Sequence, residues 1–293
     1  MSYEADFSRA KTLVEALPYI QKHRGETFVI KYGGSAMEDE HLVERTLRDV
    51  VFLEAVGIRP VLVHGGGKAI THRMREAKIK AQFVNGLRVT DAASMAIVES
   101  TLDEIINPMI VGHIGGFGTR AVGISGKAVF RARKLPPQRL TPQAEPVDLG
   151  FVGDVAGIDS TAVRQALGDG QVAVISPVGV DEAQTVLNVN ADVAAAALAA
   201  ELRAAKLIYI SDVRGIMRDP TAADSLIPSV TSAQVARLIE EEVISGGMIP
   251  KVQSAVESLG RGVGSVHLID GRIAHSLLLE IFSSLGHGTE ILP

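Results

Sequence analysis

The sequence predicts an α/β fold, a three-layer αβα sandwich with a mainly parallel central sheet. Two observations support this fold class. Short apolar runs alternate with longer amphipathic segments along the chain, as they do where helices cover both faces of a parallel sheet. The hydrophobic content of 46% and charged content of 22% are also ordinary for a globular protein, and 293 residues suffice to bury a core.

The first expected element is a helix at residues 6–24, where apolar side chains recur at helical spacing. Pro18 should kink this helix and Gly25 should end it. Because it precedes the first strand, the helix serves either packing or a subunit contact. Compact apolar runs then predict strands at residues 27–31, 60–64, 120–124, 172–176, 206–211 and 266–269. Amphipathic segments predict helices at residues 39–56, 65–78, 91–112, 160–167, 191–204, 231–242, 251–259 and 274–285.

Two segments interrupt the alternation. Residues 134–146 hold four prolines in a polar run and are expected to form a loop. Residues 147–155 contain Gly150 and Gly153 among apolar residues, which suggests a hairpin or a lid at the sheet edge. We find no linker that separates two domains, and therefore expect one sheet with two functional halves. The expected division is a helix at residues 1–25 and one domain at residues 26–293, with halves at about 26–180 and 181–293.

Composition excludes several classes of function. The net charge of −5 argues against binding to nucleic acid through its phosphates, and the absence of cysteine excludes disulfides and thiolate chemistry. The first ten residues lack the apolar region of a signal peptide. The longest unbroken apolar run, residues 193–200, is too short to cross a membrane. We expect a cytoplasmic protein that binds neither nucleic acid nor membrane.

Glycine-rich turns follow the first two predicted strands. Lys31-Tyr32-Gly33-Gly34 follows the first strand, and His64-Gly65-Gly66-Gly67-Lys68 joins the second strand to a helix. Glycines let backbone N–H groups approach an anion, and a helix N-terminus adds a partial positive charge. The spacing matches neither a Walker A loop nor a GxGxxG motif. These turns are therefore candidates for binding phosphate by another arrangement.

Three later strand ends carry polar or charged residues. Asn188-Val189-Asn190-Ala191-Asp192 enters a helix and is either an N-cap or a polar site, Ser211-Asp212-Val213-Arg214-Gly215 follows a strand, and Gly246-Gly247-Met248-Ile249-Pro250-Lys251 delivers a lysine to a helix start. In parallel α/β folds, ligands gather at the carboxyl ends of the strands. Arg88 belongs either to a plain turn or to a clamp on a carboxylate. The histidines 64, 72 and 113 lack the spacing of metal ligands and are interpreted as surface or packing residues.

The motifs contain no general base set beside a nucleophile. An alcohol acceptor would require such a base, whereas a carboxylate is already ionised at pH 7. The remaining difficulty is to bring an anionic acceptor to an anionic phosphate. Lysines, glycine N–H groups and helix N-termini serve that purpose. The residues therefore favour phosphoryl transfer to an acid.

Taken together and in this order, these motifs resemble the N-acetylglutamate kinases of the amino acid kinase superfamily. Phe83-Val84-Asn85-Gly86-Leu87-Arg88-Val89-Thr90 adds to the resemblance, which covers the chain from about Ala10 onward. It implies the amino acid kinase fold and transfer of the γ-phosphoryl of ATP to the side-chain carboxylate of N-acetyl-L-glutamate, a step of arginine biosynthesis. It also implies Mg²⁺ carried by ATP and largely coordinated by water.

The resemblance also assigns roles to residues. Lys31 and Lys251 would neutralise the transferring phosphoryl group, and Asp192 would position both lysines. Gly33, Gly34 and Gly66 would line the phosphoryl site. Gly66, Gly67, Arg88, Asn188 and Asn190 would bind acetylglutamate, with Arg88 on its α-carboxylate. Asp212, Val213, Gly215, Ile216, Met217, Val243 and Ser245 would border ATP.

Within this family the chain resembles the arginine-inhibited type, which has an extra N-terminal helix and forms hexamers as trimers of dimers. Residues 6–24 resemble that helix, and the implied arginine-binding residues are Tyr19, His267, Glu280 and Gly286. Lys68, Asn107-Pro108 and residues 128–130 depart from the usual family pattern. These departures bear on regulation, rate or fine specificity. The alternatives are another amino acid kinase, such as an aspartate or carbamate kinase, and a non-catalytic sensor of arginine or nucleotide.

Overall fold

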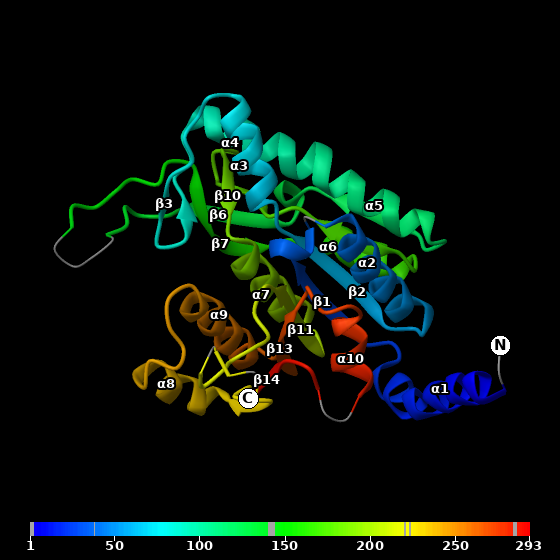
Figure 1. Ribbon diagram of the computed structural model, residues 1–293. Coiled ribbons are helices and arrows are strands. Elements are labelled where there is room, and N and C mark those ends of the chain that lie inside the picture. Colours follow the sequence, from blue (N-terminus) through cyan, green and yellow to red (C-terminus); the bar gives the residue numbers. More distant parts are fainter. Residues whose placement is uncertain (1–2, 38, 140–143, 220, 223, 284–285) are drawn as a thin grey trace.

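The computed structural model describes residues 3–293 except 38, 140–143, 220, 223, 284 and 285. The predicted, mainly parallel sheet is confirmed, with eight strands in the described residues (Figure 1). In spatial order they are β12 (Ser229–Thr231), β14 (Thr289–Leu292), β13 (Ser265–Asp270), β11 (Lys206–Ser211), β1 (Thr27–Tyr32), β2 (Arg59–His64), β8 (Val172–Ile175) and β5 (Ala121–Ile124). Neighbouring strands run parallel except for β13 and β14. The central strands β11, β1 and β2 therefore end at one edge of the sheet.

Helices cover both faces of this sheet. Alternate residues of β1 point to opposite faces, so that Phe28 and Ile30 join one core and Val29 joins the other. The first core packs α2 (Glu40–Ala55), α3 (Gly67–Glu76), α4 (Ala92–Ser100), α5 (Asn107–Gly116) and α10 (Ser276–Phe282). The second packs α6 (Thr161–Gly168), α7 (Ala191–Leu202), α8 (Ser232–Glu240) and α9 (Met248–Gly260). The three-layer sandwich predicted from the sequence is therefore correct. Within the described part of the chain, no helix is both long and apolar enough to cross a bilayer.

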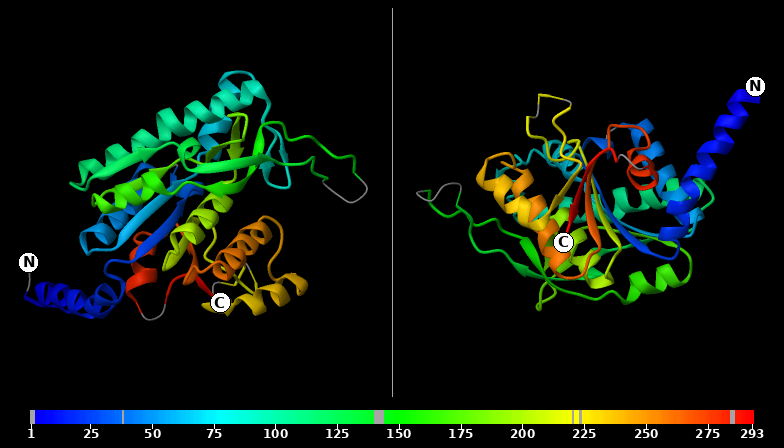
Figure 2. Two further views of the ribbon diagram at one scale, coloured as in Figure 1. Left: turned by 180° about the vertical axis from the view of Figure 1, so that it is seen from behind. Right: turned by 90° about the horizontal axis from the view of Figure 1, so that it is seen from below.

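Helix α1 (Tyr3–His23) extends away from the body of the protein (Figures 1 and 2). Pro18 lies within the helix, and Gly25 adopts a φ of +83° just beyond its end, as a helix-terminating glycine does. Apolar side chains on α1 remain exposed: Phe7, Leu13, Val14 and Leu17. Exposed apolar residues on a projecting helix indicate a surface that another protein chain could cover.

The expectation of a single sheet is wrong. A second, four-stranded barrel consists of β6 (Phe130–Lys134), β7 (Val152–Ile158), β9 (Val178–Val180) and β10 (Val186–Val189). Residues 147–155 lead into or belong to β7, which pairs antiparallel with β6. Of the two expectations for this segment, the hairpin is therefore correct, but it lies in the barrel, and the lid at the edge of the main sheet is wrong. A Cβ added at Gly153 or Gly179 would lie 2.9 Å from Leu187 or Ala132, respectively. Glycine is thus required at these two positions for close packing inside the barrel. In the sequence alone, glycines such as these are more typical of a loop.

The helix predicted at residues 91–112 is also interrupted. A π-helical segment, η2 (Thr101–Ile106), joins α4 to α5, and the Asn107 N–H donates to the Leu102 carbonyl five residues earlier. Pro108, which has no N–H to donate, lies in the first turn of α5 directly after this segment. The hydrophobic pattern is continuous across the junction, so it did not reveal the change of helix type.

The remaining elements are short. They comprise the hairpin β3 (Phe83–Val84) and β4 (Leu87–Arg88) and the 3₁₀ turns η1 (Gly34–Met37) and η3 (Gly126–Ala128). The loop predicted at residues 134–146 begins with the last residue of β6, and residues 140–143 lie outside the described part of the chain. The helix predicted at residues 274–285 is shorter and ends at Phe282, while residues 284 and 285 are not described.

Candidate active site

Two lysines meet one aspartate where β1 ends and helices α7 and α9 begin. The Nζ atom of Lys31, near the end of β1, lies 3.1 Å from Oδ1 of Asp192, and Nζ of Lys251 lies 2.6 Å from Oδ2. Asp192 lies in the first turn of α7, and Lys251 in the first turn of α9. The fold therefore brings together three residues that are far apart in the sequence, the arrangement that the resemblance implied.

The electrostatics of this triad favour its charged form. Burial by itself would raise the pKa of Asp192, but the positive charges of Lys31 and Lys251 outweigh that effect and lower it to about 2. Burial lowers the pKa of Lys251, and the negative charge of Asp192 partly offsets this lowering. The Lys251 ammonium also lies 4.8 Å from the centre of the Tyr209 ring. With two cations and one anion, the triad has a net positive charge that suits an anionic ligand.

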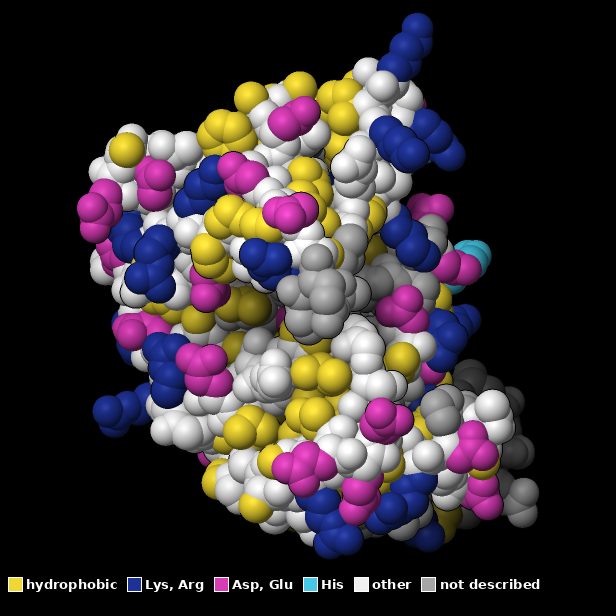
Figure 3. All heavy atoms as spheres, turned by 90° about the vertical axis from the view of Figure 1, so that its left-hand side faces the viewer, with side chains coloured by type: hydrophobic (Ala, Val, Ile, Leu, Met, Phe, Trp, Pro, Cys, Tyr) yellow, Lys and Arg dark blue, Asp and Glu magenta, His cyan; other side chains and the backbone are white. Residues whose placement is uncertain are grey.

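A cavity of about 290 Å³ opens beside the triad. It is lined by Lys31, Gly34, Gly65, Gly66, Gly67, Ile70, Phe83, Gly86, Leu87, Arg88, Leu102, Val152, Pro177, Asn188, Val189, Asn190, Ala191 and Asp192. The substrate-binding residues predicted from the sequence therefore lie around one cavity, together with Lys31, Gly34 and Asp192. Lys251 lines a second cavity of about 900 Å³, which also borders Asp192 and Asn190. Asp192 therefore borders both cavities. Figure 3 shows the side of the molecule that lies at the left of Figure 1, where β3 and α8 are found.

The glycines at this edge permit close approach. Gly34 has a φ of +76°, and a Cβ there would lie 2.5 Å from Oδ1 of Asp212. Gly33 is buried, and a Cβ on it would collide with the Lys31 ammonium at 2.8 Å. A Cβ at Gly66 would lie 2.7 Å from both Leu102 and Ile106. A side chain at any of these positions would displace a neighbouring group of the site.

Arg88 is held by the start of α3. Its guanidinium donates hydrogen bonds to the Gly67 carbonyl at 2.7 Å and to Thr71 Oγ1 at 2.8 Å, and it lies over the Phe83 ring. Only 6% of the residue is exposed, and burial lowers the pKa of the guanidinium. A buried, oriented guanidinium in a cavity wall is well placed to bind a carboxylate. The alternative of a plain turn fits the adjacent Asn85 and Gly86, both of which have positive φ.

The two asparagines differ in their contacts. Oδ1 of Asn190 accepts hydrogen bonds from the N–H groups of Asp192 and Val193, so Asn190 caps helix α7. Nδ2 of Asn188 lies 3.3 Å from Thr90 Oγ1. The cap predicted for this segment is therefore confirmed at Asn190, and both asparagines also line the cavity.

Comparison with known proteins agrees with this geometry. Residues 26–270 match the amino acid kinase family. An acetylglutamate kinase from Akkermansia muciniphila is 49% identical over 285 residues, which cover 97% of this chain and 95% of that protein. The chain belongs to the acetylglutamate kinases within the amino acid kinase family. Two solved structures of N-acetylglutamate synthase from Neisseria gonorrhoeae, with coenzyme A and either N-acetyl-glutamate or L-arginine, are 26% and 25% identical, with TM-scores of 0.83 and 0.78. This kinase matches them along its whole length but spans only 64% and 66% of those chains.

The residues expected to border a nucleotide are more dispersed in this kinase. Asp212 follows β11 and approaches Gly34, while Ile216 is buried and its N–H donates to Thr289 Oγ1. The others are placed as follows: Gly215 is buried at a φ of +147°, Met217 bridges to Leu226, Val213 and Ser245 are exposed, and Val243 is half-buried. Neither cavity beside Asp192 is lined by these residues. The structure thus brings Asp212 close to Gly34 and leaves the others around the end of β11 and before α9.

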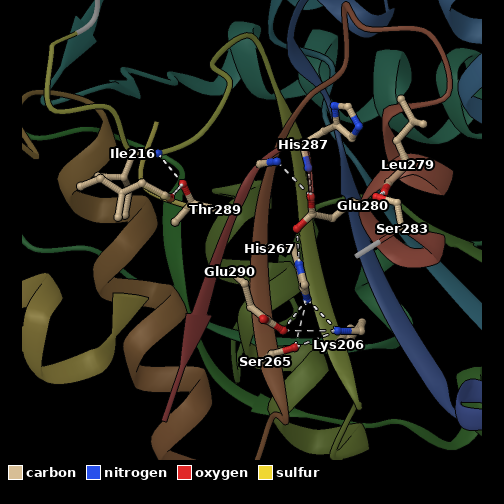
Figure 4. A network of polar contacts seen from close by, with 12 residues as sticks. Lys206, Ile216, Ser265, His267, Leu279, Glu280, Ser283, His287, Thr289 and Glu290 are labelled. Atoms are coloured by element: carbon tan, nitrogen blue, oxygen red, sulfur yellow. Dashed lines mark hydrogen bonds and ion pairs between the residues drawn. The ribbon is translucent and has the colours of Figure 1, made fainter. Parts of the chain in front are cut away.

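Three of the four residues assigned to arginine lie together in this kinase, and Figure 4 shows two of them, His267 and Glu280. Nδ1 of His267 donates to Oε1 of Glu280 at 2.7 Å, and a Cβ added at Gly286 would lie 3.3 Å from Oε2 of Glu280. Tyr19 lies half-buried on α1, and no described hydrogen bond or ion pair joins it to His267 or Glu280. The network continues through Nε2 of His267 to Lys206, Ser265 and Glu290.

Sequence reasoning missed several groups that complete the site. Tyr209 lies under Lys251, Thr71 and Phe83 hold Arg88, and the buried pair His64 and Asn107 lies behind Gly65. None of these belongs to a strand-end motif with an evident chemical role, apart from His64, which precedes the three glycines. The interpretation of His64 as a packing residue is correct as far as burial is concerned, since none of its surface is exposed.

Proposed function

We propose that this kinase transfers the γ-phosphoryl of ATP to the side-chain carboxylate of N-acetyl-L-glutamate, forming N-acetyl-L-glutamyl 5-phosphate in arginine biosynthesis. The observation that carries the proposal is the Lys31–Asp192–Lys251 triad beside a cavity that also contains Arg88. Arg88 would bind the α-carboxylate, and Asn188 and Asn190 would complete the acetylglutamate pocket. The side-chain carboxylate would then face the triad.

The proposed reaction needs no general base. Of the described residues that line the cavity, Asp192 is the one carboxylate, and its two lysine partners and low pKa keep it ionised. The acceptor carboxylate is itself ionised at neutral pH. Its oxygen would attack the γ-phosphorus as the bond to the β,γ-bridging oxygen of ATP breaks, leaving ADP. Lys31, Lys251 and the N–H groups of Gly34 and Gly66 would stabilise the charge on the transferring group.

Magnesium would enter this site with ATP. In the described part of the chain no group of three His, Asp or Glu side chains could hold a metal ion, and Asp192 is neutralised by its lysines. These residues fit an ion held chiefly by phosphate oxygens and water, to which Asp212, close to Gly34, would add a carboxylate. Such an ion neutralises phosphate charge during transfer.

A direct assay tests the proposed reaction. Incubation of the protein with MgATP and N-acetylglutamate should produce an acyl phosphate that hydroxylamine traps as a hydroxamate. Aspartate and carbamate, offered as alternative acceptors, should give far less ADP, because neither matches a pocket that holds both an α-carboxylate and an acetylated amine. Equal turnover with aspartate would favour another amino acid kinase, and no turnover with any acceptor would favour a non-catalytic sensor.

We further propose that arginine inhibits this kinase and that α1 assembles dimers into hexamers. The support is the exposed apolar side chains on α1 and the polar cluster of His267, Glu280 and Gly286 near its end. The positive charge of Lys22, on the last turn of α1, contributes to lowering the pKa of Lys206 in that cluster. Helix α1 is thus close enough to the cluster to link assembly with arginine binding.

Deletion of residues 1–25 should therefore yield dimers and weaken arginine inhibition by about 10-fold or more, a typical size for allosteric coupling. Sedimentation velocity and arginine titration of the rate measure the two effects. The double variant Leu13→Ser, Val14→Ser keeps the chain length and should act in the same direction, because it removes exposed apolar surface from α1. An unchanged sedimentation profile for both variants would eliminate the role of α1 in assembly.

A further inference from the structure

A buried polar pair lies directly behind the glycine turn of the site. His64, the last residue of β2, has no exposed surface, and Asn107, the first residue of α5, is 5% exposed. Nδ1 of His64 lies 2.9 Å from the Gly65 carbonyl oxygen, and its Nε2 lies 3.3 Å from Nδ2 of Asn107. Nδ2 of Asn107 also donates to the Val174 carbonyl at 2.9 Å. The proposed reaction assigns no role to either side chain.

These contacts determine the protonation state of His64. A carbonyl oxygen only accepts hydrogen bonds, so Nδ1 must carry the proton that it shares with Gly65. In a neutral ring Nε2 is then the acceptor, and the Asn107 amide supplies the matching donor. Burial lowers the pKa of His64 to about 4, although the Gly65 hydrogen bond and the charge of Asp103 act in the opposite direction. The ring is therefore neutral at pH 7, with its hydrogen on Nδ1.

The hydrogen bond to Gly65 also orients the next N–H group. The Gly65–Gly66 peptide is trans and planar, so its N–H points away from its carbonyl. His64 holds the carbonyl, and the N–H of Gly66 is thereby directed away from the buried ring. Nothing in the described part of the chain accepts a hydrogen bond from the Gly66 N–H, and Gly66 lines the cavity beside Lys31 and Asp192.

The π-helical segment η2 and the residue that follows it contact both Gly66 and His64. Leu102 and Ile106, within η2, pack against Gly66, and Asn107 follows at once with its amide on His64. On the other side of Asn107, a Cβ at Gly123 would lie 2.1 Å from Oδ1, so glycine is required there to make room for the amide. π-Helical segments frequently occur at functional sites.

We propose that His64 and Asn107 are positioning residues for phosphoryl transfer: together they fix the Gly65–Gly66 peptide so that the Gly66 N–H donates to the transferring phosphoryl group. The inference rests on the proposed role of Gly66 and extends it to a second layer of residues. His64 acts through Gly65 and does not contact the substrate. Asn107 acts through His64, since its amide donates to Nε2 and so holds the ring in the orientation in which Nδ1 reaches the Gly65 carbonyl.

Two substitutions at His64 separate positioning from packing. His64→Asn keeps a side-chain donor near the place of Nδ1 but removes most of the ring, whereas His64→Leu keeps apolar bulk and removes the donor. We expect His64→Leu to lower kcat by about 10- to 100-fold, which is less than the loss of an oxyanion donor because the N–H is misdirected and not removed. The KM for acetylglutamate should stay within about 3-fold, and His64→Asn should recover most of kcat. A packing role predicts the reverse order of the two variants.

Asn107→Leu provides the test of the second residue, with Ile110→Val on the same helix as its control. Without the amide donor, Nε2 of His64 loses its hydrogen-bond partner, while the Gly65 carbonyl still favours the hydrogen on Nδ1. The ¹⁵N NMR resonance of Nε2 should therefore move toward that of a ring nitrogen without a hydrogen bond, and kcat should fall several-fold because the ring is held less firmly. Ile110→Val should change neither. In the wild-type protein the same spectrum should show hydrogen on Nδ1. A hydrogen on Nε2 there, or an equal loss of kcat in both His64 variants, would overturn the proposal. Failure of the wild-type hydroxamate assay would instead overturn the proposed reaction and leave the tautomer measurement valid.

Discussion

Replacing Asp192 with asparagine should lower kcat by about 100- to 1,000-fold, the effect of losing a preorganised electrostatic group. Asparagine has nearly the same shape but no charge, so Lys31 and Lys251 would lose the anion that holds them 3.1 and 2.6 Å from its two oxygens. The two ammonium groups would then repel each other and leave their positions. The KM for acetylglutamate should not rise greatly, because removing one anion does not weaken the binding of another. Steady-state kinetics with both substrates measure this separation.

The same substitution should also reduce stability, by about 1–3 kcal/mol at pH 7, since two largely buried cations lose their partner. The pKa of Asp192 lies below its ordinary value in the folded state, so its contribution is present above about pH 4 and is lost as the pH falls through 2. Urea unfolding should therefore show a smaller difference between variant and wild type at pH 3 than at pH 7. Asp148→Asn, at an exposed aspartate 3.1 Å from Lys134, is the matched control and should leave kcat unchanged. A kcat for Asp192→Asn within about 3-fold of wild type would contradict the role of the triad.

The sequence predicted the main sheet and its helices because their apolar residues follow the period of each element. Val29 and Val61 alternate with residues of the opposite face, and the helices repeat apolar residues at 3.6-residue spacing. The barrel did not show this pattern. Its strands are short, and Gly153 and Gly179 are needed for packing that only the assembled barrel reveals. The π-helical turn before Asn107 also escaped prediction, since it changes hydrogen bonding without changing the hydrophobic pattern.

The site was predictable where charge and glycine occur together at strand ends. Lys31 lies near the end of a strand, Asp192 and Lys251 lie in the first turns of helices, and the carboxyl ends of parallel strands meet at one edge. Groups that act through another residue have no such signal. Tyr209 is one apolar position among several in β11, and Asn107 is one polar residue in an apolar helix. Their importance follows only from what they contact in the folded protein.

Lys251→Ala should lower kcat by about 100-fold or more, with little change in the KM for acetylglutamate. The reason is its location, since Lys251 contacts Asp192 but does not line the cavity that contains Arg88 and Asn188. Its ammonium would therefore act on the phosphoryl group during transfer and not on the resting acceptor. Burial against Tyr209 and the pull of Asp192 hold it in position, so alanine would leave Lys31 alone to neutralise the transferring group.

Lys134→Ala is the matched control for this prediction. It removes the same charge from an exposed lysine on β6 that pairs with Asp148, and kcat should be unaffected. Single-turnover measurements with saturating ATP distinguish the two ways in which Lys251→Ala could fail. A slow chemical step with normal acetylglutamate affinity supports action in the transition state. An increase in KM alone would show that Lys251 contributes to substrate binding in the ground state. Stabilisation of the transferring phosphoryl group would then be left to Lys31 and the glycine N–H groups.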